Sequence, residues 1–194
     1  MKNSPYEIAR EILADAIKLR QNSFDSVPQW IKAFKHLFTA LRSGKKILLC
    51  GNGGSAADCQ HFATELVVQL HRGSRRKAQP AIALSTDSSV LTAAGNDLGF
   101  EKIFSRQVEA LGLAGDLLVA ISTSGASSNV VEAAKAARKK QMKVVALTGK
   151  NGGKLAKLAD CWVAVPSADT QRVQEMHITI LHFWGEVLDA SLPQ

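Results

Sequence analysis

The amino-acid sequence predicts an α/β fold, a three-layer sandwich with a five-stranded parallel sheet that follows an N-terminal helical extension. Five short apolar runs are continuous and do not alternate with polar residues, which is typical of strands that helices cover on both faces. Helical patterns separate these runs. Strands that alternate with helices favour right-handed crossovers and therefore a parallel sheet.

The predicted elements follow one another regularly along the chain. Two helical patterns come first, at about residues 5–20 and 27–41. The apolar runs that predict strands lie at residues 46–50, 81–84, 117–121, 144–147 and 161–165. Residues 127–140 combine an apolar with a basic face, as a surface helix does, and a last helical pattern spans about 171–188.

Length and composition describe one globular domain. The 194 residues fit a single domain, with N-terminal helices in 1–43 and an α/β core in 44–194. With 46% hydrophobic and 21% charged residues, the composition excludes a disordered chain. We expect a cytoplasmic protein, because no apolar run approaches the roughly 20 residues of a membrane span and the N-terminus mixes acids with bases. The three cysteines lack CxxC spacing, which argues against a disulfide framework and a cysteine zinc site.

The net charge of +7 is compatible with an anionic ligand, with nucleic acid or with solubility alone. The densest basic stretch, residues 71–79 (HRGSRRKAQ), contains no aromatic residue. We therefore interpret it as a solvated loop and do not expect it to bind nucleic acid. Phosphate steering and a contact between subunits are the alternatives.

Two polar loops follow predicted strands, at the edge of a parallel sheet where ligands collect. Residues 51–55 (GNGGS) have three glycines that permit close approach of a ligand, and Ser55 can cap the next helix; a tight turn is the alternative. Residues 122–128 (STSGASS) carry five hydroxyls directly before a helix, which favours a phosphate site over a simple capped turn. Neither a P-loop nor a GxGxxG motif is present.

Further polar side chains lie on two predicted helices. His61 and Glu65 are four residues apart and leave the same helical face, as a base with its partner, two metal ligands or a surface hydrogen bond would. In the last helix Gln174 and His182 share one quadrant, whereas His177 turns to the other side. A hydrogen-bonded core histidine is the alternative there, and spacing does not choose between His177 and His182.

An ordered set of segments resembles the sugar-isomerase (SIS) domain family and, within it, the sedoheptulose 7-phosphate or phosphoheptose isomerases. The segments are GNGGSAADCQHFATEL, AGNDLGFEKIFSRQVEALG, ISTSGASSNV, ALTGKNGG and PSADTQRVQEMHITILH. The resemblance covers the whole chain. It implies a single SIS domain over residues 1–194 and a homotetramer whose sites are shared between subunits.

The resemblance also assigns roles to particular residues. It implies a catalytic acid/base pair of Glu65 and His182, and so selects His182 over His177. The implied phosphate contacts are Ser122, Thr123, Ser124 and Ser127. The implied contacts to the rest of the substrate are Asn52, Gly53, Gly54, Ser55, Glu65, Asn96, Asp97 and Gln174. A zinc site found in some members matches His61, Glu65, Gln174 and His182.

The implied reaction converts sedoheptulose 7-phosphate to D-glycero-D-manno-heptose 7-phosphate through an enediol, for heptose and lipopolysaccharide biosynthesis. Glu65 would take the proton from C1 while His182 moves a proton between the oxygens. Zinc would polarise the carbonyl. One position departs from the family: Gln69 stands where relatives carry an arginine, and Arg72, Arg75 and Arg76 are candidates to replace it.

Two other functions compete with the isomerase. One is a non-catalytic tetrameric regulator that binds the replication initiator DnaA; relatives of that kind lack the glutamate that this sequence keeps at Glu65. The other is a phosphosugar-sensing regulatory domain, for which no helix-turn-helix extension is visible. Retention of His61, Glu65, Gln174 and His182 favours the enzyme.

Overall fold

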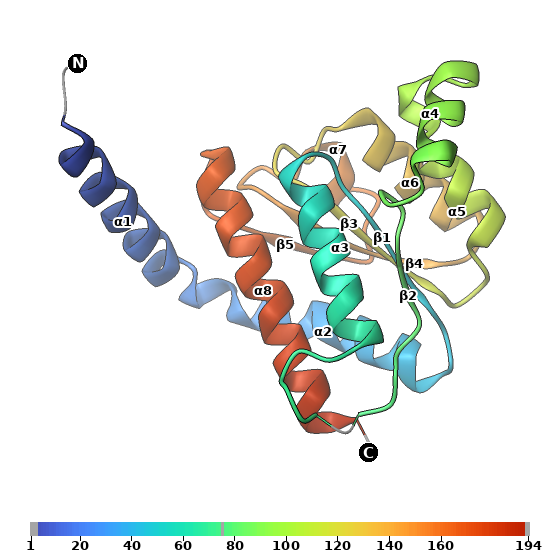
Figure 1. Ribbon diagram of the computed structural model, residues 1–194, viewed down its shortest axis with the longest axis horizontal. Coiled ribbons are helices and arrows are strands. Elements are labelled where there is room, and N and C mark those ends of the chain that lie inside the picture. The colour runs from blue at the N-terminus through green and yellow to red at the C-terminus, as the bar shows by residue number, and fades with distance from the viewer. Residues whose placement is uncertain (1–3, 75, 193–194) are drawn as a thin grey trace.

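A computed structural model describes residues 4–74 and 76–192 and confirms the predicted three-layer α/β sandwich (Figure 1). Its five-stranded sheet is parallel throughout and has the strand order β2-β1-β3-β4-β5. The strands are β1 (Ile47–Cys50), β2 (Ala81–Ala83), β3 (Leu117–Ser122), β4 (Lys143–Thr148) and β5 (Cys161–Ala164). Each strand lies on one of the five apolar runs of the sequence.

Helices connect and flank these strands. They are α1 (Pro5–Asn22), α2 (Val27–Arg42), α3 (Gly54–Val67), α4 (Ser88–Asp97), α5 (Ser105–Leu111), α6 (Ser128–Lys139), α7 (Gly153–Ala156) and α8 (Thr170–Ser191). Two 3₁₀ turns lie at Phe24–Ser26 and Phe100–Lys102. The helices α1, α2, α6 and α8 confirm the four helical patterns. The first begins at a capping box formed by Ser4 and Glu7, with Pro5 in its first turn.

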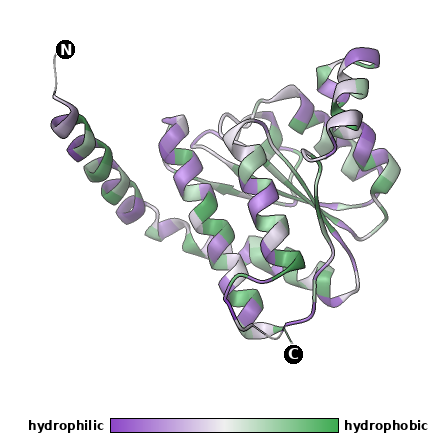
Figure 2. Cartoon of the chain, in the orientation of Figure 1, coloured by the Kyte–Doolittle hydropathy of each residue, from purple (hydrophilic) through white to green (hydrophobic). Residues whose placement is uncertain are grey.

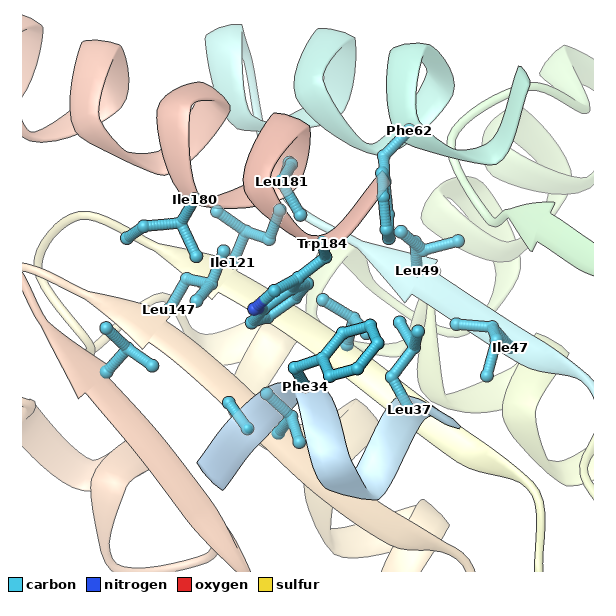
Figure 3. Packing of buried hydrophobic residues seen from close by; sticks show 14 of the residues in the cluster. Phe34, Leu37, Ile47, Leu49, Phe62, Ile121, Leu147, Ile180, Leu181 and Trp184 are labelled. Carbon is cyan, nitrogen blue, oxygen red and sulfur yellow. The ribbon is translucent and has the colours of Figure 1, made fainter. Parts of the chain in front are cut away.

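Each central strand packs against a different apolar cluster on each of its faces, which explains why the strand sequences are continuously apolar. Ile47 and Leu49 of β1 belong to the cluster beneath α2, α3 and α8, whereas Leu48 and Cys50 belong to the cluster on the other face. Figure 3 shows the first cluster around Trp184, which lies between the helices and the sheet. Its indole N–H donates to the Trp30 carbonyl of α2 at 3.1 Å.

The strand order creates a topological switch point between β1 and β3. These strands are neighbours, yet the chain continues from β1 to β2 on one side and from β3 to β4 on the other. The loops that follow β1 and β3 therefore diverge towards opposite layers and leave a crevice between them. The loop after β1 contains the glycine-rich segment 51–55, called the glycine loop below. The loop after β3 contains the hydroxyl-rich segment 122–128, called the serine loop.

Helix α1 extends away from the rest of the structure (Figure 1), and its apolar residues are visible along its length in Figure 2. Tyr6, Leu13 and Ile17 expose 70%, 64% and 59% of their surface. A hydrogen bond from Arg172 of α8 to the Ile12 carbonyl, at 3.0 Å, connects the helix to the body. Within the described residues, none of the helices has the length and apolarity that a bilayer crossing requires.

Spacing in the sequence did not show which of His177 and His182 is a core residue, and the structure answers this. His177 is completely buried on the sheet-facing side of α8, whereas His182 is partly exposed. Burial lowers the pKa of His177 to about 4 from its ordinary value of 6.5, so its ring is neutral at pH 7. His177 is therefore the core histidine.

We expect His177 to make stability depend on pH. The unfolded chain protonates this ring below pH 6.5 and the folded chain only below about 4, so stability is full above this window and falls as pH decreases through it. The loss amounts to about 3 kcal/mol. Urea unfolding of wild type and His177→Leu at one fixed protein concentration measures it. A His177→Leu variant that loses as much stability as wild type between these pH values would contradict the prediction.

Candidate active site

The glycine loop brings the start of α3 close to α8. Gly53 has a positive φ of 55° and is the N-cap of α3, so the expected capping by Ser55 is wrong: the helix begins one residue before Ser55, which lies buried in its first turn. A Cβ on Gly54 would lie 2.5 Å from Nε2 of Gln174. Only glycine at position 54 leaves room for the Gln174 side chain in its observed position.

A pair of amides joins the glycine loop to the serine loop across the switch point. Asn52 donates to Oδ1 of Asn129 at 2.9 Å, and Asn129 donates back to Oδ1 of Asn52 at 2.8 Å. Asn129 is 1% exposed and lies in the first turn of α6. No motif of the sequence singled out Asn129, although its place directly after the hydroxyl-rich segment is a usable signal. The two loops are therefore held at a fixed separation.

Three hydroxyls converge at the N-terminus of α6. Oγ of Ser122 lies 3.0 Å from Oγ of Ser127 and 3.4 Å from Oγ of Ser124. Ser127 is the N-cap of α6 but its side chain makes no capping hydrogen bond, so its hydroxyl is directed to the cluster. Thr123 is partly exposed beside them. Hydroxyls together with a helix N-terminus can bind an anion without a lysine.

The loop after β4 supports this hydroxyl cluster. Gly125 has a φ of 64°, and a Cβ there would overlap the backbone of Gly152. The Leu155 N–H donates to the Gly125 carbonyl at 3.0 Å, and the Gly149 N–H donates to the Thr123 carbonyl at 2.9 Å. The conformation of the serine loop is thus fixed by direct backbone packing.

An acid and two imidazoles meet where α3 lies beside α8 (Figure 1). Oε1 of Glu65 is 2.7 Å from Nε2 of His61 and 3.4 Å from Nε2 of His182. The two Nε2 atoms are themselves 3.0 Å apart. The side chain of Glu65 is 7% exposed, whereas those of His61 and His182 are 51% and 42% exposed. The structure therefore brings together Glu65 and His182, the pair that the family resemblance relates to acid/base chemistry, with His61 beside them.

Burial makes the carboxylates of this region more basic. It raises the pKa of Glu65 above its ordinary value of 4.5, and the charges of His61 and His182 offset part of the shift. Oε2 of Glu65 is buried without a hydrogen-bond partner among the described residues. Burial also raises the pKa of Asp58 to about 6, and its hydrogen bond with the Gln174 side chain offsets only part of this increase. Asp58 was not among the predicted site residues, although it shares a helix face with His61 and Glu65.

The cluster suits a metal ion in its donor types and spacing. One ligand atom from each of His61, Glu65 and His182 lies within 4.8 Å of the others. Two imidazoles and a carboxylate are donors that zinc commonly uses in catalytic sites. Gln174, the fourth predicted ligand, lies beside Gly54 and Asp58, and no hydrogen bond among the described residues joins its side chain to the other three. The residues thus fit a three-ligand site.

Asn96 and Asp97 are not brought into this region. They lie exposed at the end of α4, which packs on the other face of the sheet, and Asn96 donates to Oδ1 of Asp97 at 2.7 Å. No hydrogen bond or ion pair of the described residues connects either of them to the glycine loop, the serine loop or Glu65. Their role in substrate binding stays a prediction.

Three arginines were candidates to replace the family arginine that is missing at position 69, and they differ in exposure. Gln69 is half-buried in the segment after α3 and Arg72 is exposed, while Arg75 lies outside the described residues. Arg76 is 8% exposed, and its guanidinium is used inside the protein, so a substrate contact by Arg76 is contradicted. The expectation of a fully solvated loop at residues 71–79 is wrong at this residue.

Arg76 connects the ends of the two helices that carry the cluster. It donates to the Glu65 carbonyl at 2.6 Å and to the Leu66 carbonyl at 2.8 Å, and it pairs with Asp189 of α8 at 2.7 Å. Burial alone would raise the pKa of Asp189, but hydrogen bonds from Arg76 and from the His71 N–H hold it below its ordinary value. Asp189 is therefore ionised, and the pair fixes α3 against α8.

The fold and the site define a class of protein: a parallel α/β domain with a hydroxyl cluster at a helix N-terminus and an acid–imidazole cluster, which suits a sugar-phosphate isomerase. The SIS domain family model matches residues 9–149, which is more than half of the chain. The chain belongs to the SIS domain family and, within it, to the phosphoheptose isomerases, which are aldose–ketose isomerases of sugar phosphates.

Three relatives support this assignment. The phosphoheptose isomerase of Aliarcobacter butzleri is 49% identical over 183 residues, which cover 94% of this chain and 93% of that protein. The structure of phosphoheptose isomerase GmhA from Neisseria gonorrhoeae has a TM-score of 0.90 and 44% identity, over 96% of this chain and 100% of that one. A phosphoheptose isomerase structure from Francisella tularensis has a TM-score of 0.93 and 35% identity, over 97% and 100%. The regulator and sensor alternatives lose support.

We expect the ion pair of Arg76 and Asp189 to be thermodynamically coupled. Arg76→Gln leaves Asp189 buried without its counter-charge and should lower the free energy of unfolding by about 3 kcal/mol. Adding Asp189→Asn removes the uncompensated charge, so the double variant should be more stable than Arg76→Gln alone. Urea unfolding at one fixed protein concentration tests this order. A double variant as unstable as the sum of both single losses would disprove the coupling.

Proposed function

We propose that this phosphoheptose isomerase converts sedoheptulose 7-phosphate to D-glycero-D-manno-heptose 7-phosphate through an enediol, and that Glu65 and His182 are its acid/base pair. The observation that carries the proposal is the buried Glu65 carboxylate, which faces His182 from α8 and has a raised pKa. The product would enter heptose and lipopolysaccharide biosynthesis. We also propose that residues 1–194 act as one SIS domain.

The phosphate of the substrate would bind at the serine loop. Its proposed contacts are the hydroxyls of Ser122, Thr123, Ser124 and Ser127. Support comes from the convergence of three of these hydroxyls at the N-terminus of α6, where amide N–H groups and the helix dipole favour a dianion. The phosphate takes no part in the bond changes, so this loop would position the sugar.

The sugar chain would lie in the crevice between the two loops. Its proposed contacts are Asn52, Gly53, Gly54, Ser55 and Gln174. Support comes from the close approach of Gln174 to Gly54 and from the amide pair that fixes Asn52. We retain Asn96 and Asp97 as substrate contacts. Because they lie on α4, on the other face of the sheet, we propose that they contact the substrate bound to a neighbouring subunit.

The proton transfers follow from the chemistry of an acid and an imidazole. Glu65 would take a proton from C1 of the open-chain ketose, which leaves an enediolate across C1 and C2. His182 would supply a proton to the oxygen on C2 and remove one from the oxygen on C1, so that C1 becomes the aldehyde. Glu65 then returns its proton to C2. No atom is gained or lost, and both residues regain their starting state.

Zinc is part of this proposal. His61, Glu65 and His182 would hold the ion, and Gln174 stays a predicted fourth ligand. When bound, zinc would act as a Lewis acid that polarises the substrate's carbonyl and stabilises negative charge on its oxygen. The buried Oε2 of Glu65 supports the proposal, because none of the described residues donates a hydrogen bond to this carboxylate oxygen.

We further propose a cytoplasmic homotetramer with sites shared between subunits. Leu13 and Ile17 are exposed on a helix that extends away from its own domain. Apolar surface of this kind is a common mark of a subunit interface. Closed symmetry of identical subunits is the usual way to cover such a surface. The cysteines, Cys50, Cys59 and Cys161, are buried and unpaired, which is compatible with a reducing compartment.

We expect Glu65→Gln to abolish turnover of sedoheptulose 7-phosphate. Glutamine keeps the shape but cannot accept a proton, so kcat should fall at least about a hundredfold. Because the base must be ionised and its pKa is raised, wild-type kcat/KM should decline with falling pH at values above 4.5. Glu186→Gln, at an exposed position of α8, is the matched control. Turnover by Glu65→Gln at the rate of this control would refute the assignment.

The same preparations test the metal. Elemental analysis should find zinc in wild type and in Glu186→Gln, and much less in His61→Gln, which removes one imidazole donor. Removal of the metal with a chelator should lower turnover, and added zinc should restore it. Full activity of a protein shown to be metal-free would overturn the zinc proposal and leave the acid/base pair intact.

We expect Leu13→Glu combined with Ile17→Glu to produce smaller species. Both positions are more than half exposed within one subunit, so charges there should spare the monomer fold but oppose burial between subunits. Light scattering after size-exclusion chromatography measures the mass. Gln21→Glu, which adds a charge at a polar position of the same helix, is the control. A double variant that remains tetrameric would place the interface elsewhere.

A further inference from the structure

A basic cavity lies at the amino ends of the strands, opposite the active site. It has a volume of about 490 Å³ and is formed by α2, the turns before β1 and β3, and the first residue of β4. Lys45 precedes β1, and Lys143 begins β4. The serine loop follows the other end of the six-residue strand β3, roughly 20 Å away. The cavity is therefore separate from the substrate site.

The cavity concentrates positive charge without a matching set of acids. Its lining includes Lys32, Lys35, His36, Lys45 and Lys143, and no carboxylate. Among the ion pairs of the described residues, none involves Lys32, Lys35 or Lys45. Three ammonium groups at one concave surface thus lack a partner.

The nearest acids are already engaged by other groups. Asp160 pairs with Lys143 at 2.8 Å and accepts from the Val144 N–H at 2.9 Å. Asp116 pairs with Lys46 at 2.5 Å and accepts from the Leu113 N–H at 2.8 Å. Neither carboxylate can neutralise the three free lysines of the cavity.

His36 adds an uncharged polar group to the same cavity. Burial lowers its pKa from the ordinary value of 6.5; Lys143 and Lys32 lower it further, and Asp160 raises it. Its ring is therefore neutral at pH 7 and can report on charge that enters the cavity. The end of α2 also points its carbonyl groups here, but a half-charge at a helix C-terminus is small beside these lysines.

We propose that this cavity is a second anion site, which binds a small molecule carrying two linked phosphate groups. The volume lies in the range of small-molecule sites, which is about 300–1,000 Å³. Lysines from α2 and from the turn before β1 surround it, so two phosphates can contact more of them than one phosphate can. The lining contains no Phe, Tyr or Trp, and its one aromatic ring is the partly buried imidazole of His36, so it lacks the row of stacking rings that single-stranded nucleic acid uses.

Inorganic pyrophosphate is the probe for this site. We expect it to raise the pKa of His36, measured from the ring C–H signals in NMR titrations, because a nearby anion stabilises the protonated ring. Orthophosphate should bind more weakly, since it spans fewer lysines. The signals of His61 and His182 report separately on the active site, so binding there is distinguishable.

Two variants and one competitor decide the outcome. Lys35→Gln with Lys45→Gln should weaken pyrophosphate binding at His36 at least about tenfold, and turnover of sedoheptulose 7-phosphate should remain unchanged. Lys77→Gln with Lys139→Gln removes the same charge at exposed positions outside the cavity and should have no effect. The proposal is overturned by unchanged binding in the first variant or by no His36 response to millimolar pyrophosphate. It is also overturned by an oligothymidine that displaces pyrophosphate at equal phosphate concentration.

Discussion

The close packing of α3 against α8 is the contact on which the proposed active site depends. Near the start of α3, Gly54 admits the Gln174 side chain. Farther along, a Cβ on Gly185 of α8 would lie 3.0 Å from Cδ2 of Leu70, which is a tight contact, and at van der Waals distance, 3.4 Å, from Oε2 of Glu65. At the far end, Arg76 bonds the last turn of α3 to Asp189. Small side chains and one buried ion pair thus set the separation at which Glu65 and His182 meet.

Three carboxylates are buried where α3 packs against α8, and their pKa values are shifted in opposite directions. Asp189 faces a guanidinium and an N–H, so it stays ionised and serves structure. Glu65 and Asp58 face imidazoles and an amide, which compensate burial only in part, so their pKa values rise. A carboxylate with a raised pKa is a better proton acceptor at neutral pH. The choice of partner therefore separates a structural acid from acids suited to proton transfer.

The pattern of apolar residues predicted the strands and the long helices. Strands buried on both faces must be continuously apolar, and surface helices repeat apolar residues at helical spacing. This pattern did not predict partners that come from distant segments, such as the pairing of Asn52 with Asn129 or of Arg76 with Asp189. Helical spacing gave the direction of His177 but not its depth, which follows from the packing of α8 on the sheet. The division at residues 43 and 44 stays a prediction. The basic cavity gathers lysines that are scattered along the sequence, so no local pattern revealed it.

The two ends of the sheet offer different groups to the anions that we propose bind there, and the difference bears on catalysis. At the serine loop, hydroxyls and a helix N-terminus replace lysines, so the phosphate would be held by fixed dipoles. Because the phosphate is the same in ketose, enediolate and aldose, these contacts stabilise all three equally. Uniform binding lowers KM and leaves the barrier of the bound substrate unchanged. The acceleration must therefore come from groups at the reacting carbons, which are the proposed pair of Glu65 and His182 and the zinc proposed beside them, because charge develops there along the reaction.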